Sequence, residues 1–127
     1  MTMPDERTRS LRWGHELLAE ISADSELSSE IRDLARSVGL TFPSPQAVQA
    51  LIASNAESLP VDLAVALETA RALFVEIQMS GTGSAATRKG VVYTLRHFPP
   101  AGAASSAASG RFIFGIESWV ARDENVL

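Results

Sequence analysis

The stretch LRWGHELLAEI, residues 11–21, repeats apolar residues at steps of three and four, which is the spacing of one face of an α-helix. The members of this apolar arc are Leu11, Gly14, Leu17, Leu18 and Ile21. The charged residues Arg12, Glu16 and Glu20 fall on the other side. The pattern predicts an amphipathic helix of about four turns, and Pro4 suits its first turn because a missing N–H costs nothing there.

The same pattern returns at residues 67–77 and aligns with the first copy without a gap. The landmarks that coincide mark helix entry, buried face and exit: Pro4 with Pro60, Leu17 with Leu73, Ile21 with Ile77, Phe42 with Phe98 and Pro43 with Pro99. An internal repeat constrains the architecture more strongly than any single motif. We therefore expect a mainly α fold of two tandem helical hairpins, over residues 3–45 and 59–101.

Each predicted hairpin has a second helix that begins at a serine and ends at a Phe-Pro pair. Ser28 or Ser29 is the expected N-cap in the first unit, and Ser84 in the second. The residues expected on the inner faces of these helices are Ile31, Leu34, Ala35 and Val38, then Val91, Thr94 and Leu95. Between the hairpins, residues 45–54 predict a short linking helix, capped by Ser44 and with Val48, Leu51 and Ile52 turned inward.

A small residue lies at the centre of both apolar arcs, Gly14 in the first and Ala70 in the second. A small residue at such a place favours the close approach of another helix. We expect Gly14→Leu to overpack this contact at a cost of about 1 to 3 kcal/mol. Gly14→Ala, which matches Ala70 and raises helix propensity, is expected to be tolerated or stabilising.

The chain changes character after residue 101. Residues 102–110 are small and polar and predict a flexible linker. Residues 111–127 carry β-branched and aromatic residues that suit a strand. Because a lone strand leaves unpaired amides, this β-prone tail is expected either to fold back as a short hairpin across Gly115 or to pair with a second subunit. Pairing, which predicts a homodimer through the tail, is the favoured alternative. The candidate interaction residues are Phe112, Phe114, Ile116 and Trp119.

Composition narrows the classes of function. The chain has 127 residues, a net charge of −4 and no cysteine, which excludes disulfides and thiolate metal sites. No apolar run approaches the roughly 18 residues that cross a bilayer, and the first residues contain no hydrophobic signal core, so we expect a cytoplasmic protein without membrane contact. No segment has a basic surplus, which disfavours a nucleic-acid partner.

Residues with catalytic or ligand chemistry are few. His15 and His97 have no second histidine at metal-ligand spacing, and no serine lies in the strand-to-helix elbow of a hydrolase. The sequence therefore predicts no catalytic residue, no metal site and no cofactor, and the protein is not expected to be an enzyme.

The loop at residues 80–90 contains glycines before a helix, with two basic residues one turn in. Such a loop can bind a phosphate group through backbone amides. The residues of this candidate anion-binding loop are Ser84, Arg88 and Lys89. It lacks the phosphate-loop motif and a preceding strand, so a plain hairpin loop capped by serine is the favoured interpretation.

Two motifs resemble those of a known family. MTMPDERTRSL, residues 1–11, and LRHFP, residues 95–99, are similar to the ends of short proteobacterial proteins without assigned activity. Members of that family open M-T-x-P-D-E-R-T-R-[AS]-L and close a single helical hairpin with L-R-H-[FY]-P, so this chain resembles a doubled or expanded member. The resemblance implies a helical fold and a bacterial source. It implies no site residues and does not extend to the tail.

These observations favour a non-catalytic bacterial protein that acts by binding another protein. One alternative is a small acidic inhibitor or accessory factor of a mobile element or phage, acting on a defence or nuclease complex. Another is a phosphate-ligand binder or enzyme that uses residues 80–90. An apolar groove on the helical surface would favour the first hypothesis, and a continuous acidic face across both hairpins would favour the second.

Overall fold

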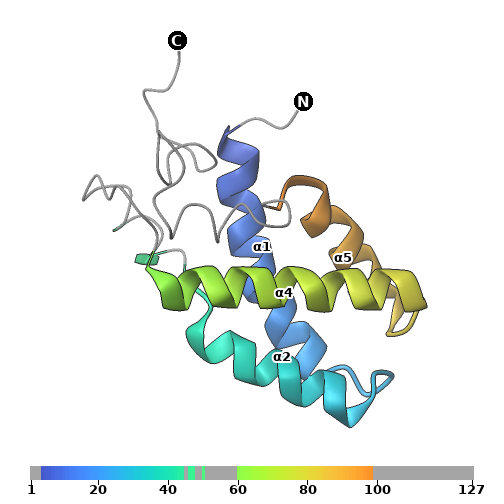
Figure 1. Cartoon of the computed structure of the whole chain (residues 1–127). Coiled ribbons are helices and arrows are strands. Elements are labelled where there is room, and N and C mark those ends of the chain that lie inside the picture. Colours follow the sequence, from blue (N-terminus) through green and yellow to red (C-terminus); the bar gives the residue numbers. More distant parts are fainter. Residues whose placement is uncertain (1–3, 45, 48–49, 51–59, 99–127) are drawn as a thin grey trace.

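The computed structural model describes residues 4–44, 46–47, 50 and 60–98 (Figure 1). The helices in this part of the chain are α1 (Pro4–Ser22), α2 (Ser29–Thr41), α4 (Val61–Ser80) and α5 (Ala85–His97). These residues contain no β-strand. The expectation of a mainly helical protein is therefore confirmed, whereas the predicted linker, the β-prone tail and the linking-helix residues Val48, Leu51 and Ile52 lie outside the described residues.

The four helices form two hairpins that pack against each other. Helix α1 contacts α2 of its own hairpin and α5 of the other, and α4 likewise contacts both α5 and α2. Figure 1 shows α4 running across the front of the molecule, with α1 behind it and α2 below it. Each long helix is therefore held by the short helices of both hairpins. None of the described helices combines the length and the apolarity that a membrane span requires.

The short helices begin and end in the same way. Ser28 accepts a hydrogen bond on Oγ from the amide of Ile31, and Ser84 accepts one from the amide of Thr87, both at 3.2 Å. Each helix has 13 residues, and each ends where the amide of a phenylalanine bonds the carbonyl four residues back. Ser28, not Ser29, is therefore the first cap, and the expectation for Ser84 is confirmed.

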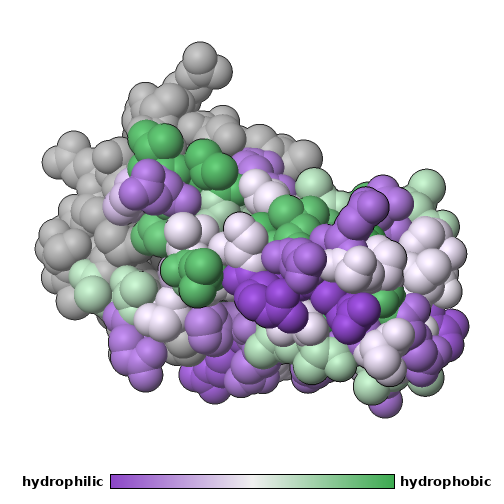
Figure 2. All heavy atoms as spheres, turned by 90° about the horizontal axis from the view of Figure 1, so that it is seen from below, coloured by the Kyte–Doolittle hydropathy of each residue, from purple (hydrophilic) through white to green (hydrophobic). Residues whose placement is uncertain are grey.

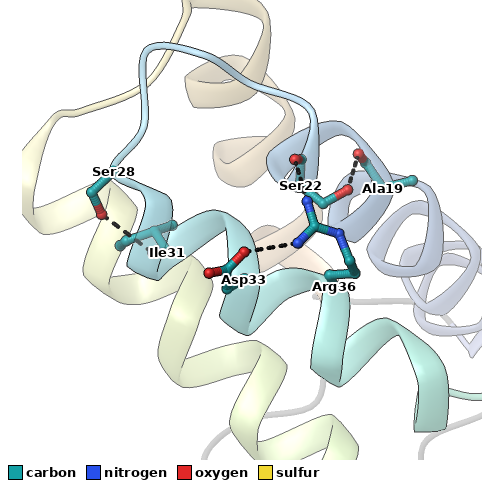
Figure 3. A network of polar contacts seen from close by, with 6 residues as sticks. All are labelled: Ala19, Ser22, Ser28, Ile31, Asp33 and Arg36. Carbon is teal, nitrogen blue, oxygen red and sulfur yellow. Dashed lines mark hydrogen bonds and ion pairs between the residues drawn. The ribbon is translucent and has the colours of Figure 1, made fainter.

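The turn between α1 and α2 is also fixed by side chains (Figure 3). Arg36 donates one guanidinium hydrogen bond to Asp33 at 2.8 Å and a longer one to the carbonyl of Ser22 at 3.5 Å. Ser22 in turn donates to the carbonyl of Ala19 at 2.8 Å. These contacts join the end of α1 to the middle of α2 on the exposed side of the hairpin.

The core lies between the hairpins and draws on all four helices. Its buried apolar residues include Leu11, Leu18, Ile21, Ala35, Val38, Leu67, Ala70, Phe74, Ile77 and Val91. The expected inner positions of the short helices are mostly correct, since Ile31 and Leu95 pack on this core and Thr94 is buried. Leu34 is an exception: it is 43% exposed, so the expectation that it faces the core is wrong.

The rings of Phe42 and Phe98, which end the short helices, meet in the core. Their centroids lie 6.2 Å apart in a stacked arrangement, and Phe74 contacts Phe98 edge to face at 5.7 Å. Aromatic pairs of this kind stabilise a core by about 0.5 to 1.5 kcal/mol beyond the area they bury. The ends of both hairpins are therefore joined through one aromatic cluster.

Gly14 of α1 is buried against this cluster. A Cβ atom at Gly14 would lie 2.9 Å from Cε1 of Phe98 and 3.1 Å from Cζ of Phe42. Close approach at Gly14 was expected, but the approaching groups are two rings, not a helix backbone. This geometry argues against the expectation that Gly14→Ala is tolerated, because even a methyl group requires a packed ring to shift.

The segment after the first hairpin is described in part. The hydroxyl of Ser44 accepts a hydrogen bond from the amide of Ala47 at 3.1 Å, which is the capping contact expected of it.

Candidate functional site

Helices α1 and α5 run antiparallel and are tied together near both ends. At one end, the hydroxyl of Ser10 donates a hydrogen bond to the carbonyl of His97 at 3.1 Å, and Ser10 is fully buried. At the other end, Asp24, just after α1, reaches the first turn of α5. These hydrogen bonds therefore fix the spacing between α1 and α5 on either side of the surface between them.

The carboxylate of Asp24 makes the hydrogen bonds at this second end. Oδ2 accepts hydrogen bonds from the amide of Ser84 at 2.9 Å and from the hydroxyl of Thr87 at 2.7 Å, while Oδ1 accepts from the amide of Glu26 at 2.9 Å. The bond from the Ser84 amide, followed by those from Thr87 and Glu26, lowers the pKa of Asp24 from 3.8 to about 2. The positive end of the α5 dipole acts in the same direction. An internal anion thus occupies the N-terminus of α5.

The candidate anion-binding residues in the loop at residues 80–90 make contacts within the protein. The amide of Ser84 donates a hydrogen bond to Asp24. The hydroxyl of Ser84 caps α5 by accepting a hydrogen bond from the amide of Thr87. Arg88 donates from Nε to the carbonyl of Gly83 at 3.2 Å, and the ammonium of Lys89 lies 5.9 Å from the centre of the Tyr93 ring. The three residues of the candidate anion-binding loop therefore have partners within the protein, and the helix terminus already holds a carboxylate.

Between the two ties lies a hollow of about 370 Å³ on the surface. It is lined by Trp13, Glu16, Leu17 and Glu20 of α1 and by Gly90, Tyr93 and Thr94 of α5. We call it the α1/α5 groove. Its volume is in the lower part of the range of small-ligand pockets, and it is large enough for one or two side chains.

Gly90 creates much of this space. A Cβ atom at this position would meet only Cδ1 of Leu17, at 3.1 Å, so the groove floor is the bare backbone of α5. A glycine inside a helix costs about 1 kcal/mol relative to alanine. The position that aligns with Gly90 in the first hairpin, Leu34 of α2, carries a large side chain. The missing side chain at Gly90 therefore leaves space for the groove.

Charged groups surround the aromatic walls of the groove. Glu16 and Glu20 are exposed on the α1 side. On the α5 side, the guanidinium of Arg96 lies 5.4 Å from the centre of the Tyr93 ring, within cation–π range. The groove thus has an acidic rim on one helix and a basic rim on the other.

The histidines considered in the sequence lie apart from this groove. The ring of His15 lies 6.3 Å from that of Phe42, and its Nδ1 is buried without a hydrogen-bond partner. His97 offers its backbone carbonyl to Ser10. Within the described part of the chain, no three His, Asp or Glu side chains are grouped as metal ligands. The interaction residues Phe112, Phe114, Ile116 and Trp119 lie outside the described residues.

Sequence patterns alone did not identify Gly90, Tyr93 or Asp24. Gly90 carried the strongest signal, because glycine is rare inside a predicted helix and marks a packing or functional constraint. Tyr93 follows it by one helical turn, which places both on one face. No local pattern indicates that Asp24 contacts the start of α5 in the other hairpin.

The described residues form a four-helix arrangement of two hairpins with an aromatic groove between α1 and α5. No protein-family model, curated protein or solved structure matches the chain. The resemblance to the short proteobacterial proteins stays a prediction.

Proposed function

We propose that this chain is a non-catalytic helical protein that binds a segment of another protein in the α1/α5 groove. The observation that supports this most strongly is the groove itself: an apolar hollow that is bounded by Trp13 and Tyr93 and has a hydrogen bond between α1 and α5, or between Asp24 and α5, beyond each end. A site that is formed before binding avoids part of the ordering cost of association. An apolar groove also favours this function over an inhibitor that acts through a continuous acidic face.

The chemistry of the groove indicates the kind of segment that fits. The volume accommodates one aromatic or leucine side chain as an anchor over Gly90. Anchors of this kind provide most of the binding energy at protein interfaces. A lysine or arginine next to the anchor would meet Glu16 and Glu20, and an acidic residue on its other side would meet Arg96. We therefore propose a helical or extended segment with an apolar anchor between charges of opposite sign.

Selection from a displayed random-peptide library tests this proposal. Peptides are selected on the full-length protein and counter-selected on Gly90→Leu, which fills the groove from its floor. The matched control is Val92→Leu, on the same helix but outside the groove, where Val92 is 45% exposed. We expect peptides with an aromatic or leucine anchor that bind the wild type and Val92→Leu alike. The proposal fails if every enriched peptide also binds Gly90→Leu with unchanged affinity.

We also propose that the two hairpins are copies of one unit. The support is the matching of equivalent features: Ser28 and Ser84 cap, and Phe42 and Phe98 end, two helices of equal length. Superposition of residues 3–45 on 59–101 in an experimental structure tests this, and unrelated paths of the backbones would contradict it.

A further inference from the structure

The chain continues from one end of the α1/α5 groove. Helix α5 ends at His97, whose carbonyl accepts the hydrogen bond from Ser10 of α1, and the next residue, Phe98, is buried in the core. Residues 99–127 follow Phe98 directly and lie outside the described residues. Gly90, on the groove floor, lies about 12 Å before Phe98 along the helix axis, at 1.5 Å per residue. The rest of the chain therefore starts close to the groove.

One stretch of this remaining chain has the chemistry that the groove fits. In RFIFGIE, residues 111–117, the apolar residues Phe112, Phe114 and Ile116 alternate, so an extended backbone presents all three on one side. Arg111 and Glu117 bound this apolar run with charges of opposite sign. We call residues 111–117 the tail segment.

We propose that the tail segment docks in the α1/α5 groove of its own chain, with Phe114 over Gly90. The groove holds one or two side chains, and Tyr93 on its wall is 47% exposed. A phenylalanine ring placed against this wall removes apolar surface from water on both partners. Docking therefore buries an apolar run and an aromatic wall that would otherwise both face solvent.

The charges set the direction of the tail segment across the groove. Arg111 meets the exposed carboxylates of Glu16 and Glu20 on α1, and Glu117 meets the exposed guanidinium of Arg96 on α5. An extended backbone separates residues 111 and 117 by about 20 Å, at 3.3 Å per residue. Two helices packed side by side are together about as wide. The segment therefore crosses both helices, with its two charges on rims of opposite sign.

The connecting chain is long enough for this contact. A coil of the length of residues 99–111 spans roughly 20 Å, against the distance of about 12 Å from Phe98 back to Gly90. A linker whose length is comparable to the span raises the effective concentration of the attached segment to the millimolar range. A tail segment that binds with a dissociation constant of about 1 mM as a separate peptide would then occupy the groove for about half of the time.

Other surfaces of the described residues fit the tail segment less well. On the face that Figure 2 shows, hydrophobic residues form separate patches among hydrophilic ones. A second hollow, on α4, has no aromatic residue among the described residues that line it, which are Glu68, Arg71, Ala72, Val75, Glu76 and Met79. The α1/α5 groove is therefore the better match for a segment with two phenylalanines.

Docking of the tail segment regulates the groove. The tail segment and a segment of another protein cannot occupy the same hollow, so each lowers the apparent affinity of the other. This competition rests on the proposed function, whereas the docking itself does not. The tail thus acts as an internal competitor that a partner must displace.

Paramagnetic broadening in the NMR spectrum of the full-length protein tests the docking. A nitroxide is attached to Ser118→Cys, beside the tail segment, and the natural chain has no cysteine that could compete for the label. We expect broadening of the Trp13 indole and of the Gly90 and Tyr93 amides, with little effect on Val65 of α4. No broadening at the groove, or equal broadening over all four helices, would overturn the proposal.

A mixing experiment distinguishes the chain's own tail from that of a second copy. Protein labelled with ¹⁵N but without the nitroxide is mixed with unlabelled protein that carries it, so that only contacts between chains broaden the signals. We expect no broadening at the groove in this mixture. Broadening as strong as within one chain would assign the tail segment to a second copy and overturn the proposal.

Substitutions test the residues assigned to the contact. Phe114→Ser should abolish the broadening at the groove, whereas Val126→Ser, in the tail but outside the tail segment, should leave it unchanged. Arg111→Glu should weaken the broadening, and adding Glu16→Arg should restore it. Equal effects of the two serine substitutions, or no rescue by the exchanged charges, would contradict the assigned contact.

Peptide binding separates this inference from the proposed function. A library peptide that binds the groove should bind Phe114→Ser several-fold more tightly than wild type, because the competitor is removed. A peptide that binds both proteins equally, with no broadening at the groove, would overturn the docking and leave the proposed function standing. Broadening at the groove without any peptide that binds there would support the docking and count against the proposed function.

Discussion

Removing the charge of Asp24 is the perturbation for which the structure gives the clearest magnitude. In Asp24→Asn, one oxygen can still accept from Ser84 and Thr87, but the charge is lost and an amide group faces the N–H of Glu26. Hydrogen bonds to a charged group contribute about 1.5 to 3 kcal/mol, against about 1 kcal/mol for neutral ones. The favourable interaction of the carboxylate with the α5 terminus, about 0.3 to 1 kcal/mol, is also lost. We expect Asp24→Asn to lower the free energy of unfolding by about 2 to 3 kcal/mol.

The loss should depend on pH in a defined direction. Folding lowers the pKa of Asp24 from 3.8 to about 2, so its ionised form stabilises the native state. This contribution is fully present above pH 4 and is lost as the pH falls towards 2. The difference between wild type and Asp24→Asn should therefore be constant above pH 4 and shrink below it.

Urea unfolding at several pH values, followed by circular dichroism, measures both effects. The matched control is Asp33→Asn, which removes an exposed carboxylate whose partner Arg36 lies one turn away on the same helix. Exposed pairs of this kind contribute less than about 1 kcal/mol. Equal effects of the two substitutions, or an Asp24→Asn effect that stays the same from pH 7 to pH 2, would refute the assigned role of Asp24.

Two further predictions concern packing and capping. Gly14→Ala should lower the free energy of unfolding by about 1 kcal/mol, because overpacking against Phe98 outweighs the gain in helix propensity; a more stable variant in chemical denaturation would contradict this. Ser28→Ala should cost about 1 kcal/mol and Ser84→Ala more, because the Ser84 hydroxyl also lies 3.2 Å from that of Thr87; thermal melts that rank them in the opposite order would contradict the capping geometry.

Periodic patterns predicted the helices well, because each helix is specified by local features. The three- and four-residue steps around Leu17 and Leu73 located the long helices, and the serine caps located the starts of the short ones. The position of Leu34 could not be obtained in this way. It lies at an inward step of its helix but is 43% exposed, because the burial of a position also depends on tertiary packing.

The candidate groove was harder to predict from the sequence, because it also depends on tertiary packing. Its walls come from the first and last described helices of the chain, and its depth depends on the antiparallel register of α1 and α5, which Ser10 and Asp24 fix through long-range hydrogen bonds. The sequence did contain Gly90 as an unusual residue within a predicted helix. Only the register shows that it lines the same groove as Trp13.

The central claim is that the α1/α5 groove binds a protein segment, and NMR mapping tests it most directly. The ¹⁵N-labelled full-length protein is titrated with a peptide selected on the wild type. We predict that the largest shift changes fall on the indole of Trp13 and on the amides of Gly90 and Tyr93, while exposed residues of α4 such as Val65 change little. Changes centred on α4, or spread evenly over all four helices, would contradict the claim.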